Sequence, residues 1–296
     1  MKMFPNLRPR IGTIALDVAV FGQQAPAHLH GLPASEARMS VGTGIEWTDA
    51  TWNPVTGCTR VSSGCDNCYA ATLAHRLLAN HYLQREPAVP SPETNADPFA
   101  VRLWPERLAD PQRWTTARMI FVNSMSDLFH ADVPEAFIRD VFQVMLRADH
   151  HIYQVLTKRP GRALRFWRRN RDLFGSAEEI PSHIWIGASV ENQRTAYRVA
   201  HLRAVPAGVR FLSCEPLLGP ITLQLEGIHW VIAGGESGVV RRPMKEEWAR
   251  SVRDQCLEQG VAFFFKQVGG RTPKAHGRLL DGRTWDEYPS HLRAAL

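Results

Sequence analysis

The sequence predicts a partial or full (β/α) barrel, because short apolar runs alternate with longer amphipathic stretches along the chain. The runs lack polar alternation and are rich in β-branched and aromatic residues, which is typical of strands buried on both faces of a parallel sheet. They are Met119–Val122, Ile152–Leu156, Ile184–Ile186, Val209–Leu212, Ile228–Ala233 and Val261–Phe265. Polar residues follow nearly every run, which indicates one shared mouth at the strand ends, as in a barrel. A doubly wound sheet would concentrate such residues at one switch point.

A short first strand is expected within residues 45–52, and helices are expected between the strands. The predicted helices are Ala70–Arg85, Pro134–Asp149, Arg162–Phe174, Asn192–Ala204 and Lys245–Gln259. Pro134 and Pro160 suit the first turn of a helix, and Gly260 suits the end of the last one. With the first strand included, the pattern predicts seven βα-type units.

One barrel domain over residues 41–270 accounts for most of the 296 residues. Residues 1–40 are expected to form a peripheral or disordered extension, and Met39 is an alternative to Met1 as the start of translation. A Pro-rich insertion at residues 86–114 reads as a long irregular excursion, which is usually a functional lid or a disordered segment. Residues 271–296 form a polar C-terminal tail with a turn at Asp281-Gly282.

The composition excludes several classes of protein. At 44% hydrophobic and 22% charged residues, the chain is neither collagen-like, coiled-coil nor wholly disordered. No apolar run is long enough for a transmembrane helix, so no membrane partner is expected. A net charge of +6 permits an anionic partner without requiring one. An odd set of five cysteines does not resemble a secreted disulfide framework, and a cytoplasmic location is predicted.

Cys58, Cys65 and Cys68 form a C-x6-C-x2-C pattern in a Gly-rich loop at residues 57–69, directly before a predicted helix. Three thiolates on such a loop can surround a metal centre, and its glycines allow tight turns beside it. A structural zinc site would need a fourth ligand, such as His75. A [4Fe–4S] cluster usually takes four cysteines, so three leave one iron open to another ligand. The pattern favours the cluster and leaves zinc as the alternative, whereas Cys214 and Cys256 read as core residues.

Polar residues at the strand ends supply the other candidate site residues. The predicted catalytic carboxylates, suited to general acid–base chemistry, are Asp127, Glu215 and Glu236. The predicted cofactor-binding residues are Ser124, Thr157, Lys158, Ser189 and Glu191. The segment Lys158–Arg171 carries seven basic residues and no acid, with Phe166 and Trp167 between them. This pattern is consistent with a nucleic-acid-binding face with stacking aromatics. The favoured interpretation is a solvated outer helix whose aromatic side chains pack inward.

Several segments along the chain form a recognisable set: the run from Ile45 to Cys58, Cys68-Tyr-Ala, FVNSMSDLFH (121–130), VLTKRP (155–160), SCEPLL (213–218), GGESG (234–238) and FFKQ (264–267). Together they resemble the phage Gp37/Gp68 family, also called the three-Cys-motif proteins. The resemblance covers about residues 39–290. That family in turn resembles radical S-adenosylmethionine (SAM) enzymes, so a barrel of the radical SAM type is implied, with a cluster loop after its first strand.

Two departures from the radical SAM pattern stand out. The usual cysteine spacing is C-x3-C-x2-C, whereas the first gap here is six residues. The Gly-Gly-Glu segment that usually binds the SAM amine ends the second strand, whereas Gly234-Gly-Glu236 follows the sixth. The amine-binding role is therefore not carried over to Glu236.

The resemblance implies that the three cysteines hold a [4Fe–4S] cluster whose open iron binds the amine and carboxylate of SAM. One-electron reduction would cleave SAM, and the resulting radical would abstract hydrogen from a substrate, for which a nucleic acid or nucleotide is the expected class. An electron donor such as a ferredoxin or flavodoxin is implied as a partner. Two alternatives stay open: a zinc- or cluster-stabilised nucleic-acid-binding protein without catalysis, and a barrel hydrolase that uses Glu215 and Glu236 beside a structural metal.

Overall fold

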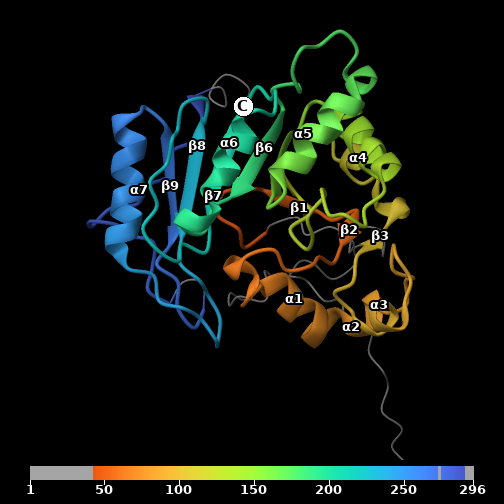
Figure 1. The fold of residues 1–296 in the computed structure, drawn as a ribbon, viewed down its shortest axis with the longest axis horizontal. Coiled ribbons are helices and arrows are strands. Elements are labelled where there is room, and N and C mark those ends of the chain that lie inside the picture. Colours follow the sequence, from red (N-terminus) through yellow and green to blue (C-terminus); the bar gives the residue numbers. More distant parts are fainter. Residues whose placement is uncertain (1–42, 273–274, 291–296) are drawn as a thin grey trace, which may run out of the picture.

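The computed structural model describes residues 43–272 and 275–290 of the chain (Figure 1). The N-terminal extension expected over residues 1–40, with its two candidate translation starts, lies outside the described residues. So do the last six residues of the expected C-terminal tail.

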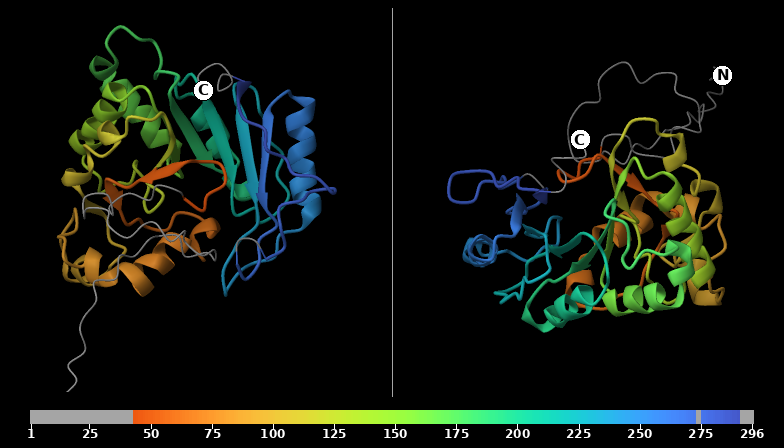
Figure 2. Two further views of the ribbon diagram at one scale, coloured as in Figure 1. Left: turned by 180° about the vertical axis from the view of Figure 1, so that it is seen from behind. Right: turned by 90° about the horizontal axis from the view of Figure 1, so that it is seen from above.

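Seven parallel strands form one sheet, and each strand pairs with the next one along its order. That order is β1 (Ala50–Trp52), β4 (Met119–Val122), β5 (Ile152–Thr157), β6 (Ile184–Ser189), β7 (Arg210–Cys214), β8 (Trp230–Gly234) and β9 (Ala262–Gln267). The spatial order follows the sequence without reversal, unlike a doubly wound sheet. Within the described residues β1 and β9 do not pair, so the sheet curls without closing (Figure 2). The predicted barrel is confirmed in its partial form.

The strands lie at the predicted apolar runs, with small differences at their ends. β4 has the predicted bounds, and β5 and β6 continue further into the polar residues that follow each run. A separate antiparallel pair, β2 (Val55–Thr56) and β3 (Arg102–Leu103), was not expected from the sequence. It joins the start of the cysteine loop to the Pro-rich insertion.

The main helices cover the outer face of the sheet (Figures 1 and 2). They are α4 (Glu135–Arg147), α5 (Pro160–Arg169), α6 (Tyr197–Arg203) and α7 (Glu246–Glu258). The single helix predicted over residues 70–85 is instead α1 (Tyr69–Leu73), a π-helical segment (Ala74–Leu78) and α2 (Ala79–Tyr82). The end of the helix predicted at Arg162–Phe174 and the start of the one predicted at Asn192–Ala204 differ as well, because Arg171–Phe174 and Gln193–Thr195 are 3-10 turns.

The Pro-rich insertion is built into the fold. It contains β3 and a short helix, α3 (Pro92–Ala96), whose first turn is closed by a reciprocal capping box between Ser91 and Thr94. The backbone N–H of Cys58 donates a hydrogen bond to the carbonyl of Phe99 at 3.0 Å. The insertion therefore supports the beginning of the cysteine loop.

Two layers of apolar side chains lie on the two faces of the sheet, because successive strand residues point to opposite sides. On the outer face, residues such as Ile186 and Leu212 pack against the helices. The inner face carries a second cluster, which we call the aromatic floor: Phe121, Trp185, Phe211, Trp230 and Phe264. Gly187 leaves space for this packing, since a Cβ atom there would stand 2.5 Å from Cε1 of Phe211.

The C-terminal segment covers the outer edge of β9. The N–H of Phe265 donates to the carbonyl of Trp285 at 2.9 Å, and the N–H of Glu287 donates to that of Phe263 at 3.2 Å. These bonds satisfy backbone groups that an uncovered edge strand would expose. Among the helices that the structure describes, none has both the length and the apolar character needed to span a membrane.

Candidate metal and cofactor site

The cysteine loop (residues 57–69) crosses the carboxyl ends of the strands, which we call the mouth of the half-barrel (Figure 1). Cys58, Cys65 and Cys68 are all half-buried and unpaired. Gly57 opens the loop with a φ of 84°, where a Cβ atom would stand 2.6 Å from the carbonyl oxygen of Phe99. Only glycine fits this position, because the backbone is left-handed and in close contact with the insertion.

The first tether of the loop is Arg159, which follows the end of β5. Its Nη1 donates to Asp127 Oδ2 at 2.8 Å and lies 3.6 Å from the Sγ of Cys58. Its Nη2 donates to the carbonyl and the hydroxyl of Thr59 at 3.1 and 3.2 Å. Asp127 also accepts a hydrogen bond from Thr157 Oγ1 at 2.7 Å. Two predicted site residues thus hold an arginine against the first cysteine.

The environment of Cys58 disfavours a bare thiolate. Burial and the nearby Asp127 carboxylate raise the pKa of its thiol to about 11, although Arg159 acts in the opposite direction. Because a metal binds the deprotonated sulfur, loading this position releases a proton.

The second tether is Glu191, which follows the end of β6. Ser62 of the loop donates to its Oε1 at 2.9 Å, and a Cβ atom at Gly64 would stand 2.6 Å from the same oxygen. Glu191 is fully buried and forms ion pairs with Arg198 at 3.0 Å and Lys158 at 3.4 Å. Burial works to raise the pKa of Glu191, but these two cations outweigh it and hold the pKa below its ordinary value. Glu191 is therefore an ionised anchor.

The third tether is Glu236, which follows the end of β8. It accepts hydrogen bonds from Asn67 of the loop at 2.9 Å and from Arg242 at 2.7 Å. The Nη1 of Arg242 also donates to Asp66 of the loop at 3.1 Å. Burial raises the pKa of Glu236, but the hydrogen bonds from Arg242 and Asn67 outweigh it and leave the pKa lowered.

The remaining predicted residues lie around the same mouth. Tyr69, at the end of the loop, donates to the carbonyl of Ser124. The carbonyl of Ser189 accepts from Arg198 at 2.8 Å. Glu215 pairs instead with Lys266 of β9 at 3.1 Å and accepts a hydrogen bond from Ser213. The structure thus brings the predicted site residues to one end of the sheet, with all but Ser189 and Glu215 bonded to the loop or to one of its tethers.

The donor set fits an iron–sulfur cluster. In the part of the chain that the structure describes, no three His, Cys, Asp or Glu side chains are gathered around one metal-ion position. A [4Fe–4S] cluster is held by cysteine thiolates on separate irons, so their sulfurs need not meet at one point. Cysteine thiolates are soft ligands that suit iron–sulfur clusters, and here they are half-buried on a loop that hydrogen bonds hold in place. His75 was suggested from the sequence as a fourth zinc ligand. Both nitrogens of its ring already have partners, the carbonyl of Ala71 at 2.8 Å and the carboxylate of Asp97 at 3.2 Å.

Sequence reasoning missed several residues that secure the loop: Ser62, Asn67, Arg159, Arg198 and Arg242. Arg159 could have been predicted as a site residue, because it directly follows Thr157 and Lys158, which were both selected for their place at a strand end. The others are polar residues of loops and one helix, and no local pattern separates them from ordinary surface residues.

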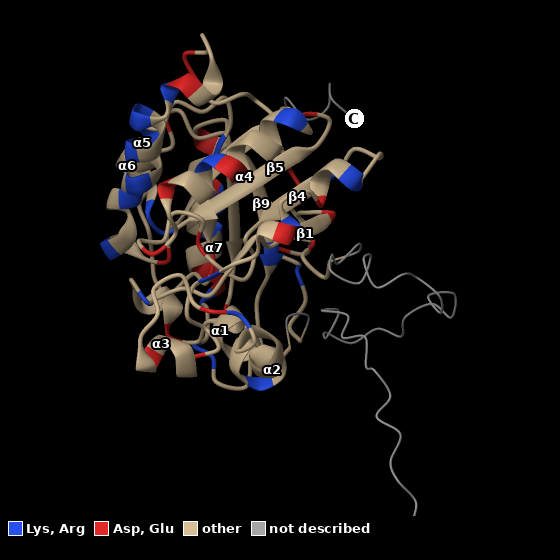
Figure 3. Cartoon of the chain, turned by 90° about the vertical axis from the view of Figure 1, so that its right-hand side faces the viewer, with Lys and Arg blue, Asp and Glu red and all other residues tan. Residues whose placement is uncertain are grey.

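Lys158 and Arg159 face the mouth, and the rest of the basic segment Lys158–Arg171 follows α5 on the outer surface (Figure 3). Phe166 and Trp167 are buried, at 3% and 2% exposure, and pack against the helix-side core. Arg165, Arg168 and Arg169 are exposed. The aromatics thus pack inward, as the outer-helix interpretation expects, while nucleic-acid binding by the arginines stays a prediction.

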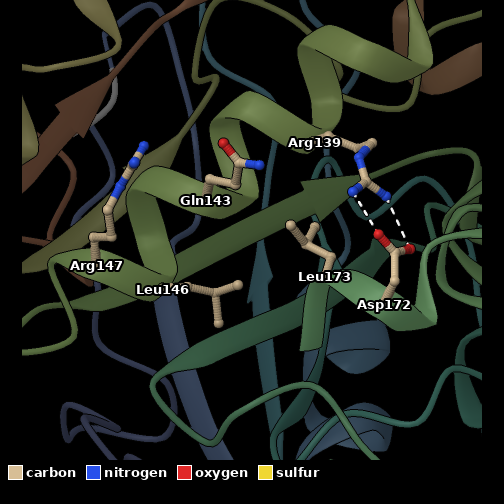
Figure 4. Close-up of a pocket in the computed structure, with 6 residues that line it drawn as sticks. All are labelled: Arg139, Gln143, Leu146, Arg147, Asp172 and Leu173. Carbon is tan, nitrogen blue, oxygen red and sulfur yellow. Dashed lines mark hydrogen bonds and ion pairs between the residues drawn. The ribbon is translucent and has the colours of Figure 1, made fainter. Parts of the chain in front are cut away.

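A shallow hollow on the outer surface lies apart from this site (Figure 4). It is lined by Arg139, Gln143, Leu146, Arg147, Asp172 and Leu173. Arg139 forms an ion pair with Asp172 at 2.6 Å. None of the predicted site residues lines it.

Comparisons with known proteins give one structural likeness. No curated protein matches the chain. A solved structure described as "Spore photoproduct lyase complexed with dinucleoside spore photoproduct" is similar with a TM-score of 0.40 and 12% sequence identity. The match covers 70% of this chain and 61% of that chain, less than two thirds of the latter's length. A likeness at this level does not assign an activity.

A family match is far more extensive. It runs over residues 42–289 and agrees with the extent of about residues 39–290 expected for the phage Gp37/Gp68 resemblance, although it does not confirm that name. The matching model carries the description "Protein of unknown function (DUF5131)". Because it spans most of the sequence, including the cysteine loop and all three tethers, the chain belongs to the DUF5131 family.

Proposed function

We propose that this protein is a radical-SAM-like iron–sulfur enzyme that reductively cleaves S-adenosylmethionine to abstract hydrogen from a substrate. The observation that carries the proposal is the cysteine loop, held at the mouth of the half-barrel by Arg159, Glu191 and Glu236 from three different strand ends. The mouth is where (β/α) barrels place their reactive groups.

In this proposal Cys58, Cys65 and Cys68 hold three irons of a [4Fe–4S] cluster and leave the fourth iron open. When bound, the cluster supplies the electron that cleaves SAM. The tethers fix the position of the loop, and the aromatic floor beneath it excludes water from the inner face. Lys266 lies two residues beyond Phe264, where β9 shifts in register against β8, and it pairs with Glu215 at 3.1 Å.

Anaerobic reconstitution with iron and sulfide, followed by EPR of the reduced protein with and without SAM, tests this function. We expect a [4Fe–4S] signal that SAM perturbs, together with release of 5′-deoxyadenosine. Both are lost in Cys65→Ala and kept in the matched control Cys256→Ala, which removes a core sulfur outside the loop. A SAM-insensitive protein that releases no 5′-deoxyadenosine would overturn the proposal.

The partner and substrate are part of the same proposal. The net charge of +6 supports an anionic substrate, such as a nucleic acid or nucleotide. The chemistry requires a one-electron donor, and a ferredoxin or flavodoxin is the class proposed, in a cytoplasmic setting.

A second candidate function, nucleic-acid binding without catalysis, is favoured by the exposed arginines of α5. It predicts an affinity for a single-stranded oligonucleotide that falls steeply with salt and weakens when Arg165 and Arg168 are replaced by Gln. The hydrolase alternative needs Glu236 to exchange a proton, whereas its contacts with Arg242 and Asn67 favour an ionised anchor.

A further inference from the structure

We infer that Arg159 sets the reduction potential of the cluster and slows its loss of iron, by donating an N–H···S hydrogen bond to Cys58. The inference rests on the proposed function, because it requires the cysteines to hold an iron–sulfur cluster. From the sequence, Arg159 was singled out only as a member of the basic segment Lys158–Arg171, with no role at the cysteines.

The geometry confines the guanidinium to one orientation. Its Nη1 is shared between Asp127 Oδ2 at 2.8 Å and Cys58 Sγ at 3.6 Å, and its Nη2 is bound twice by Thr59. A guanidinium is planar with N–H groups in fixed directions, so contacts on both terminal nitrogens leave it little freedom. The side chain is only 15% exposed.

The residues around Arg159 are themselves held in place. Asp127 accepts from the hydroxyl of Thr157 at 2.7 Å, from the N–H of Phe129 at 3.0 Å and from the N–H of Lys158 at 3.0 Å. The hydroxyl of Thr59 also lies 2.6 Å from the Nε2 of His130. The arginine therefore cannot leave Cys58 without disrupting a network that joins the segment after β4, the end of β5 and the cysteine loop.

The three sulfurs are not equivalent in this respect. Cys65 has a neutral neighbour, the hydroxyl of Ser62, at 4.0 Å. Within the described contacts of the three thiols, a cationic donor reaches Cys58 alone. The effect of Arg159 is thus assigned to one ligand of the cluster.

The sign of the effect follows from charge. Reduction adds one negative charge to the cluster and its thiolates. A cation and a hydrogen-bond donor beside a thiolate stabilise the more negative state, and they raise the potential. Removal of Arg159 makes the cluster harder to reduce.

The test is an EPR-monitored redox titration of the reconstituted protein, paired with the rate of iron release to a chelator. In Arg159→Gln we expect a more negative midpoint potential and roughly 10-fold faster iron release, the scale of losses seen on removing groups that support metal ligands. Arg159→Lys keeps the charge but cannot contact Asp127, Thr59 and the sulfur together, so we expect an intermediate shift. Arg168→Gln, on the exposed side of α5, the helix that begins directly after Arg159, is the matched control.

Thermal melting of the cluster-free proteins shows whether each variant folds, and Arg159→Lys carries the test if Arg159→Gln does not. A folded, cluster-loaded variant with the wild-type potential and rate of iron release overturns the inference and leaves the proposed function standing. A wild-type protein that takes up no cluster overturns both.

Discussion

The floor and the mouth of the half-barrel are built from the same strands but by different forces. On β8, Trp230 belongs to the aromatic floor, and six residues later Glu236 tethers the cysteine loop. The ring of Trp230 lies 5.9 Å from those of both Trp185 and Phe211, and such packing depends on buried area more than on direction. At the mouth, buried ions make directed bonds to the loop. The comparison indicates that the floor stabilises the fold, whereas the mouth positions the cysteines.

The largest effect on stability should follow from Trp230→Ala, which empties the centre of the floor. Truncation of a fully buried aromatic side chain costs about 3–5 kcal/mol of unfolding free energy. Urea denaturation followed by circular dichroism measures the loss. Trp248→Ala, at a half-buried site on α7, is the control and should lose clearly less. Equal losses would mean that the floor is not the main source of stability.

Glu191→Gln should cost about 3 kcal/mol, because it leaves the 1%-exposed Arg198 side chain without its charge partner. The lowered pKa of Glu191 also gives the effect a pH dependence. A carboxylate whose folded-state pKa is depressed contributes its full stability above the unfolded-state pKa and loses it as pH falls through the folded-state value. The wild type should therefore lose stability on acidification more steeply than the variant. Parallel curves of urea midpoint against pH would contradict this.

Gly64→Ala should affect the loop more than the fold. Its new Cβ atom would meet Oε1 of Glu191 at 2.6 Å, and overpacking of this kind costs about 1–3 kcal/mol. We expect a folded protein that binds less iron after reconstitution, measured by metal analysis. Gly44→Ala, with no atom within 4 Å of its added Cβ, should bind iron like the wild type. Unchanged iron content in Gly64→Ala would show that the loop does not need its contact with Glu191.

The smallest effect is expected for Arg168→Ala on the outer surface of α5. Arg168 is exposed in the last turn of α5, and substitution of such a surface side chain changes stability by no more than about 0.5 kcal/mol. Differential scanning calorimetry beside the wild type measures this, and a larger change would mean that the outer arginines have a structural role as well.

The sheet could be predicted because each strand carries its own signal. Met119–Val122 is an unbroken apolar run between Arg118 and Asn123, and β4 has those bounds. The segment 70–85 differs because its middle turn, Ala74–Leu78, is π-helical, and such a turn departs from the period of about 3.6 residues on which the prediction of one helix depended. The antiparallel pair β2 and β3 is too short for periodicity to reveal.

The site could be predicted only as a set of residues at strand ends. Strand ends indicated Asp127, Glu191 and Glu236, and spacing indicated the cysteines, but neither indicates which groups bond to each other. The contact of Arg159 with Cys58 joins residues 101 positions apart, and the bond from Asn67 to Glu236 joins residues 169 apart. Such pairings arise from the curl of the whole sheet, so local sequence does not contain them.

These long-range tethers also have a consequence for biosynthesis. Asp66 lies 176 positions before Arg242. A ribosome that adds about 5–20 residues per second would leave roughly 9–35 s between the synthesis of the two. During that interval the thiols of the nascent chain lack most of their native contacts and are open to oxidants and stray metal ions. For the cluster proposed here, delivery of iron and sulfide to the native loop would therefore come late, after most of the protein has left the ribosome.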